Sequence, residues 1–150
     1  MIRLRALVLF ALLLAPPALA EPRSPGIGFV QSVEGTWWCR DGDAAKAFDC
    51  AARKCRAEAG SETCVATRWC APAGWSGLMV IWLPEFHNTV ALCGTPSQAA
   101  LVAAFKALCA GDEVVTRCEF VAVIDPDGKE TAIEDTNWPG PTMGDPPSSQ

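Results

Sequence analysis

Eight cysteines constrain the fold of this chain more than any other feature of its sequence. No Cys-x-x-Cys pair occurs and the chain has 1 histidine, so the ligand spacing of a structural zinc site is missing. An even number of cysteines is typical of disulfides in exported chains, because the compartments outside the cytoplasm are oxidising. We therefore expect a disulfide-stapled domain with no metal and no other cofactor. The cysteines are Cys39, Cys50, Cys55, Cys64, Cys70, Cys93, Cys109 and Cys118.

Residues 1–20 have the three regions of a secretory signal peptide. Arg3 and Arg5 precede an apolar run over residues 6–14. The small-residue motif Ala18-Leu19-Ala20 then forms a cleavage site. The apolar run is shorter than the ~20 residues that a helix needs to cross a bilayer. We expect a mature chain that is periplasmic or secreted and has no membrane span.

The mature chain is acidic. Cleavage removes Arg3 and Arg5 but no acidic residue, so the formal net charge moves from -5 to -7. Such a surface disfavours nucleic acid and anionic lipid, which are bound mainly through Lys and Arg. Residues 21–138 suit a single domain. Residues 139–150 hold 4 prolines and almost no apolar side chain, and predict a flexible tail.

A shift of 54 positions indicates an internal repeat. It superimposes three pairs of cysteines and the Pro-x-Gly motif of two predicted turns. The predicted copies cover residues 27–92 and 93–138. The superimposed pairs are Cys39 with Cys93, Cys55 with Cys109, Cys64 with Cys118, Pro72 with Pro126, and Gly74 with Gly128.

The repeat restricts how the cysteines can pair. Each copy holds three repeated cysteines, an odd number, so one from each must cross between the copies or pair with an unrepeated cysteine. We expect two bridges from a helix end to the next strand, one bridge between the copies and one within the first copy. Each would contribute about 2–4 kcal/mol, mainly by restricting the unfolded chain. The predicted pairs are Cys55–Cys64, Cys109–Cys118, Cys39–Cys93 and Cys50–Cys70.

Two helices are predicted from their spacing and caps. The first covers residues 44–59, with Asp43 as N-cap and Gly60 after its end. The second follows the capping box 95–98, with a proline at its first helical position, and ends before Gly111. Strands and turns fill the rest, giving an α+β class built from two pseudo-equivalent β-α-β-β units. The strands are predicted at 29–38, 64–69, 78–83, 89–92 and 114–124, with turns at 71–74 and 125–128.

No catalytic residue is predicted. His87 lies near Glu85, but a cysteine nucleophile is unexpected where the thiols are oxidised. A glycoside hydrolase needs two carboxylates across a cleft, and no pattern pairs Glu34, Glu85 or Glu119. The segment 125–128 lacks the third acidic position and distal Glu of a calcium loop, so we predict a turn there instead.

Six tryptophans, with no tyrosine, are the most suggestive feature for binding. Trp37 and Trp38 are adjacent, so on a strand one should face the core and the other should point outward. Exposed indoles can stack on sugar rings or anchor a protein partner. The predicted binding residues are Trp37, Trp38, Trp75 and His87.

One stretch resembles a family of small exported bacterial domains of unknown function. It runs from Ala44 through Cys55 and Cys64-Val65 to Cys70-Ala71, about thirty residues. In that family an alanine-rich helix ends in Cys, a second Cys opens a strand, and a later Cys precedes Ala. Here the first two cysteines are further apart and the preceding Trp-to-Tyr-rich strand is missing. The resemblance implies a disulfide-stapled exported bacterial module and no mechanism.

Two functional hypotheses follow from these features. The first is a non-enzymatic binding protein of the bacterial envelope, such as an inhibitor, an immunity-type protein or an accessory subunit, whose partner is another envelope or secreted protein. The second is a small hydrolase of envelope polymers that uses His87 or a carboxylate. A structural role within an envelope assembly is a third possibility.

Overall fold

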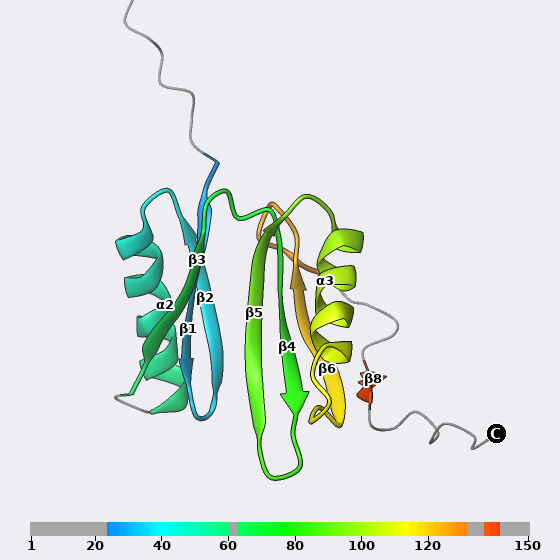
Figure 1. Ribbon diagram of the computed structural model, residues 1–150. Helices are drawn as coiled ribbons and strands as arrows, with labels where there is room; N and C mark the ends of the chain where they lie inside the picture. Colours follow the sequence, from blue (N-terminus) through cyan, green and yellow to red (C-terminus); the bar gives the residue numbers. More distant parts are fainter. Residues whose placement is uncertain (1–23, 61–62, 132–136, 142–150) are drawn as a thin grey trace, which may run out of the picture.

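The computed structural model describes residues 24–60, 63–131 and 137–141 (Figure 1). It confirms the α+β class. The signal peptide and residues 142–150 of the expected tail lie outside the described residues. The elements in chain order are β1 (Gly26–Ser32), β2 (Gly35–Asp41), α2 (Ala44–Ala59), β3 (Val65–Cys70), β4 (Trp75–Trp82), β5 (His87–Thr95), α3 (Gln98–Ala110), β6 (Arg117–Ile124), β7 (Glu130–Thr131) and β8 (Asn137–Pro139).

Two antiparallel sheets form the centre of the molecule. The first sheet has the strand order β2-β1-β3, and the second has the order β5-β4-β6-β7, with β8 also paired to β6. The chain passes from one sheet to the other through residues 71–74. None of the helices in the described part of the chain is long and apolar enough to cross a bilayer.

The segment 29–38, predicted as one strand, is the hairpin of β1 and β2. It turns at Val33 and Glu34, without the Asn-Gly or Asp-Gly pair that marks most two-residue turns. Each half therefore runs β-β-α-β instead of β-α-β-β. A β-bulge leaves Thr67 of β3 unpaired in the first sheet and Val121 of β6 unpaired in the second. These bulges are also 54 positions apart, but a duplication stays a prediction.

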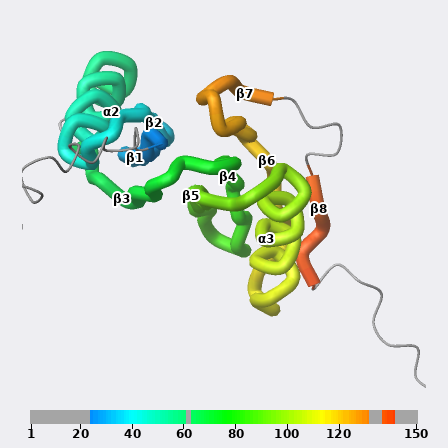
Figure 2. Tube along the Cα trace, turned by 90° about the horizontal axis from the view of Figure 1, so that it is seen from above, coloured from blue at the N-terminus to red at the C-terminus, as the bar shows by residue number. Residues whose placement is uncertain are grey.

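The elements stack in four layers, with α2 outside the first sheet and α3 outside the second (Figure 1). Seen along the strands, the helices lie on opposite outer sides and β3 runs beside β5 (Figure 2). The inner faces of the sheets meet in a buried cluster around Phe29, Leu78 and Ile124. Outside it, α2 buries Ala51 and Cys55 against Val30, and α3 buries a larger cluster. That cluster includes Met79, Leu101, Phe105, Phe120 and Val123.

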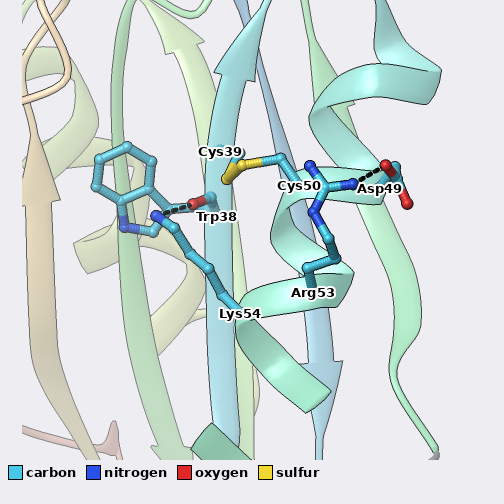
Figure 3. Close-up of a disulfide and its surroundings, with 6 residues drawn as sticks. All are labelled: Trp38, Cys39, Asp49, Cys50, Arg53 and Lys54. Carbon is cyan, nitrogen blue, oxygen red and sulfur yellow. Dashed lines mark hydrogen bonds and ion pairs between the residues drawn. A yellow bond between two sulfur atoms is a disulfide. The ribbon is translucent and has the colours of Figure 1, made fainter. Parts of the chain in front are cut away.

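Four disulfides tie these layers together, and none of the cysteines is free. The predicted pairs Cys55–Cys64 and Cys109–Cys118 are confirmed, each joining a helix to the next strand. The predicted pairs Cys39–Cys93 and Cys50–Cys70 are wrong. Cys39 of β2 pairs with Cys50 of α2, which lies directly over it (Figure 3). Cys70 pairs with Cys93, so the bridge between the sheets uses the unrepeated cysteine at the end of β3.

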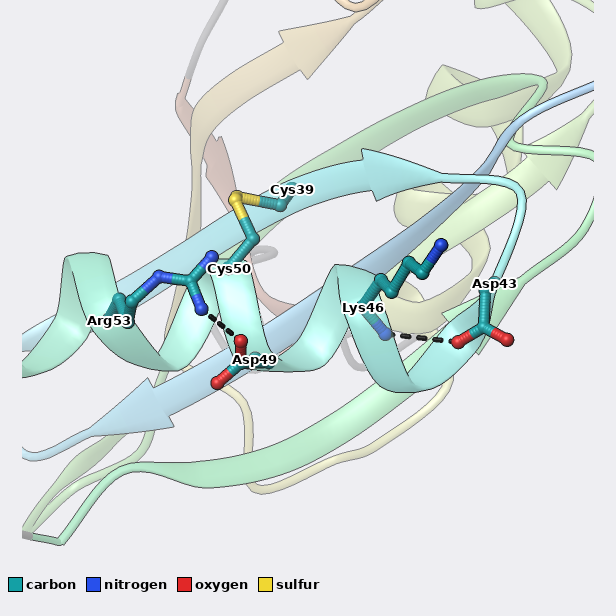
Figure 4. Close-up of polar contacts among 6 residues, drawn as sticks. All are labelled: Cys39, Asp43, Lys46, Asp49, Cys50 and Arg53. Atoms are coloured by element: carbon teal, nitrogen blue, oxygen red, sulfur yellow. Dashed lines mark hydrogen bonds and ion pairs between the residues drawn. A yellow bond between two sulfur atoms is a disulfide. The ribbon is translucent and has the colours of Figure 1, made fainter.

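The helix ends follow the local sequence. Asp43 caps α2 by accepting a 3.1 Å hydrogen bond from the Lys46 backbone N–H (Figure 4). Gly60 ends α2 with a φ of 61°, as the sequence predicts. In α3 the N-cap is Ser97, which accepts from the Ala100 N–H, so the proline lies before the helix and not in its first turn.

Candidate functional site

The two sheets pack tightly at one end and separate toward their hairpin turns, where they leave a cleft of about 770 Å³. We call it the inter-sheet cleft. Its volume lies within the range of about 300–1,000 Å³ that is usual for ligand sites. It gathers side chains from both sheets. They include Gln31, Val33, Glu34, Thr36, Val65, Thr67, Val80, His87, Thr89 and Val121.

Three exposed valines face this cleft. Val33 is 89% exposed, Val65 is 62% exposed and Val121 is 56% exposed. They come from the turn between β1 and β2, from β3 and from β6. Single exposed apolar side chains are ordinary, but three that line one concave site offer apolar area that a ligand can bury.

The β-bulges help to present this surface. Val121 is the extra residue of the bulge in β6, and Thr67 is the extra residue of the bulge in β3. A bulge redirects side chains out of their regular alternation. Both bulged residues line the inter-sheet cleft. The cleft is therefore formed where each sheet departs from regular pairing.

Gln31 is the main polar group between the two sheets. Its side-chain Nε2 donates to the backbone carbonyl of Thr89 at 2.8 Å and to the hydroxyl of Thr36 at 3.1 Å. Gln31 belongs to β1 and Thr89 to β5, so the first bond joins the two sheets. This amide holds the sheets at a defined separation beside the cleft.

His87, one of the predicted binding residues, lines the inter-sheet cleft. It begins β5 opposite Trp82 of β4, and the two rings lie 4.8 Å apart between centroids. The next cross-strand neighbour of Trp82 is Arg117, whose guanidinium lies 4.6 Å from the indole centroid. Trp82 is thus flanked by these two neighbours and is partly buried.

Only one of the three candidate carboxylates lines the cleft. Glu34 does so, and its Oε2 accepts a 2.8 Å hydrogen bond from the Ser32 hydroxyl. Glu85 lies in the turn between β4 and β5. Glu119 lies on β6, where its Oε2 is 4.0 Å from Nη2 of Arg117. The structure therefore brings Glu34 and His87 into one cleft and leaves the other two carboxylates outside it.

The predicted tryptophan sites are not brought together. Trp37 and Trp38 do lie on opposite faces of β2, but both are partly buried, because Trp37 packs toward α2 and Trp38 toward the second sheet. Trp37 packs toward α2 and its Nε1 donates to Glu58 at 2.6 Å. Trp38 packs between the sheets with Lys54 5.4 Å from its ring (Figure 3). Trp75 packs on the far side of the second sheet, against the α3 cluster.

The segment 125–128 is a turn, as predicted. Its Gly128 N–H donates to the Asp125 carbonyl at 3.0 Å, and the Asp125 carboxylate accepts from the N–H groups of Asp127 and Lys129 at 2.9 Å. The Asp125 side chain therefore stabilises the turn by accepting hydrogen bonds from its backbone. Among the described residues, no group of three or more His, Cys, Asp and Glu side chains could hold a metal ion.

A second hollow, of about 700 Å³, lies on the outer face of α3, but its lining comes from that helix and its N-cap alone. The inter-sheet cleft is the stronger candidate because groups from six strands converge on it. Comparisons with family models, with curated proteins and with solved structures find no match for this chain.

Proposed function

We propose that this chain is an exported, non-enzymatic binding protein of the bacterial envelope, whose ligand site is the inter-sheet cleft. The observation that carries the proposal is the set of three exposed valines that face one cleft from three strands or turns. Removing apolar area from water is favourable by about 25 cal/mol per Å². A ligand that covers these side chains gains that free energy, and the adjacent hydroxyl and amide groups orient it.

The disulfide framework supports the proposed compartment. All eight cysteines are paired, in bridges whose sequence separations run from 9 to 23 residues. Such bridges persist in oxidising compartments and are rare in the cytosol. They also suit a protein that presents a preformed cleft, since a rigid site loses less entropy when a ligand binds.

A pair of matched variants tests the proposed site. Val65 and Val114 are both exposed valines, at 62% and 53%, but only Val65 lines the cleft. The oxidised mature protein would be immobilised as wild type, Val65→Lys and Val114→Lys, and incubated with the periplasmic and secreted fractions. We expect the wild type and Val114→Lys to capture one envelope or secreted protein in stoichiometric amount. We expect Val65→Lys to capture none of it. Equal capture by all three proteins would contradict a role for the cleft.

One observation favours the hydrolase as a second candidate. His87 and Glu34 line the same cleft, so an imidazole and a carboxylate flank one concave site. An imidazole there could act as a general base, with the carboxylate as a charged partner. The test is release of soluble fragments from purified envelope polymers, compared among wild type, His87→Ala and Glu34→Gln. Hydrolysis that both substitutions abolish would establish the hydrolase. Absence of fragment release by the wild type would exclude it.

A further inference from the structure

The inter-sheet cleft lies between two free strand edges. Among the strands that the structure describes, β3 pairs only with β1 in the first sheet, and β5 pairs only with β4 in the second. The two edges approach at one end, where the Cys70–Cys93 bridge holds their Cα atoms 5.9 Å apart. Toward the hairpin turns they separate, and the cleft opens between them. Figure 2 shows β3 and β5 running side by side.

The cleft continues along these edges as a groove. A smaller hollow of about 180 Å³ adjoins it and shares Gln31, Thr67 and Thr89 with its lining. Together the inter-sheet cleft and the smaller hollow extend along β5 from His87 to Ala91. An elongated groove between two strand edges has the shape of an extended polypeptide, which rises about 3.3 Å per residue.

The backbone of β5 points its polar groups into this groove. The Trp82 carbonyl accepts from the Thr116 N–H at 2.9 Å, so the polar groups of Trp82 face β6 and not β5. In an antiparallel pair the residues alternate between facing the partner and facing away. His87, opposite Trp82, therefore directs its N–H and C=O away from β4, and Thr89 and Ala91 do the same.

The Gln31 side chain already bonds to one of these backbone groups of β5. The Thr89 carbonyl accepts from the Gln31 side-chain amide at 2.8 Å. An amide N–H is the same donor that a neighbouring strand would offer to this carbonyl. The edge of β5 is thus satisfied at Thr89 by a side-chain substitute for a missing strand.

Opposite charges lie near the two ends of the groove. Glu34 lines its open end, and Arg68 lines the narrow end. Within the described part of the chain neither side chain forms an ion pair. A ligand with a basic side chain at the open end and an acidic one at the narrow end is complementary to this arrangement.

We propose that the ligand of the inter-sheet cleft is an extended polypeptide segment that adds as a strand to the free edge of β5. This inference rests on the proposed binding function. Main-chain hydrogen bonds to His87 and Thr89 supply affinity, and the ligand's amide replaces that of Gln31. Its apolar side chains on the cleft side cover Val65 of the facing strand β3. A basic residue near Glu34 and an acidic one near Arg68 set the direction of the segment.

The test begins by selecting ligands with a displayed library of random linear peptides, using the oxidised protein as target. Selected peptides are synthesised, and their affinities are measured by calorimetry against wild type, Val65→Lys and Val114→Lys. We expect alternating apolar residues between a basic and an acidic residue, and a loss of affinity of about tenfold or more with Val65→Lys only. Failure to enrich any peptide overturns the proposal.

Strand addition is then tested by N-methylating alternate peptide amides, which removes backbone donors without changing side chains. We expect the affinity to fall by about tenfold or more in one of the two N-methylation registers. The bound unmodified peptide should also slow amide hydrogen exchange at His87 and Thr89. Glu34→Lys should weaken binding, and a peptide with an acidic residue in place of the basic one should recover it.

The outcomes separate this proposal from the proposed function. If N-methylation in both registers leaves the affinity unchanged while Val65→Lys abolishes binding, the cleft is a binding site but strand addition is wrong. If Val65→Lys has no effect on the selected peptides, both proposals fail. A concentration-dependent dimer that protects the same amides, measured by sedimentation, would make a second copy of this chain the occupant and would also overturn the peptide ligand.

Discussion

Gly77 shows how closely the layers pack at a single residue. A Cβ atom at this position of β4 would lie 2.7 Å from the Ala122 carbonyl oxygen. It would also lie 3.2 Å from side-chain atoms of Leu101 and Phe105 on α3. The Cβ atom would fit only if the backbone of β6 and helix α3 both moved away from β4. That movement would loosen the cluster that α3 buries against the second sheet. Glycine is therefore required here by space and not by a special backbone angle.

We predict that Gly77→Ala lowers the free energy of unfolding by about 1–3 kcal/mol, the usual cost of overpacking. Urea denaturation measures this change. Gly42→Ala is the matched control, because a Cβ there would meet nothing within 4 Å. A stability of Gly77→Ala equal to that of Gly42→Ala would show that both the backbone of β6 and the side chains of α3 can move to admit the Cβ atom.

Asp43, the N-cap of α2, and Asp49, in its second turn, differ in what they stabilise (Figure 4). Asp43 satisfies a backbone N–H at the helix N-terminus, whereas Asp49 forms an exposed ion pair with Arg53. We predict that Asp43→Ala costs about 0.5–2 kcal/mol and Asp49→Ala at most about 0.5 kcal/mol. Thermal unfolding of the oxidised proteins compares them. The reverse order would mean that the ion pair, and not the cap, stabilises this helix.

Among the described elements, one disulfide, Cys70–Cys93, cross-links the two sheets, in addition to the backbone of residues 71–74. That bridge closes 23 residues, whereas Cys39–Cys50 closes 11 within the first sheet and its helix. In the chain-entropy description a longer closed loop restricts the unfolded state more. The Cys70–Cys93 bridge should therefore contribute more to the free energy of unfolding than the Cys39–Cys50 bridge.

We predict that replacing Cys70 and Cys93 by alanine costs about 0.7 kcal/mol more than replacing Cys39 and Cys50, from loop length alone. Guanidinium denaturation of both double variants gives the difference. A smaller cost for the inter-sheet pair would indicate that the cluster around Phe29 keeps the sheets together without the bridge.

At the scale of the whole molecule, the disulfide map is the most direct check of the topology. We predict four cross-linked peptides after digestion without reduction, and no thiol that reacts in the unfolded protein. Mass spectrometry of the digest identifies the pairs. Finding Cys39 joined to Cys93 would contradict the arrangement of the two sheets. The expected pairs are Cys39–Cys50, Cys55–Cys64, Cys70–Cys93 and Cys109–Cys118.

Local features of this molecule could be predicted from the sequence, since local chemistry decides them. The cap at Asp43, the stop at Gly60 and the turn at 125–128 each depend on a few neighbouring residues. The two helix-to-strand bridges were predictable for the same reason. The pairs Cys39–Cys50 and Cys70–Cys93 were not, because they depend on which strands lie at which edge of the two sheets.

The candidate site was harder to predict than the fold. His87 was singled out because it is the one histidine, and it does line the cleft. The valines were missed, because Val65 and Val121 look like ordinary strand residues in the sequence. Their exposure depends on two β-bulges and on the separation of the sheets. The adjacent tryptophans are a related case, because alternation predicts opposite faces of the strand but not that both side chains pack against other elements.

The single bridge between the sheets has a steric consequence. It holds the edges of β3 and β5 5.9 Å apart between Cα atoms at one end, whereas the hairpin turns lie at the open end of the cleft. The width available to a ligand therefore differs along the cleft. We expect bulky side chains of a ligand to fit near Val33 and not beside Cys93.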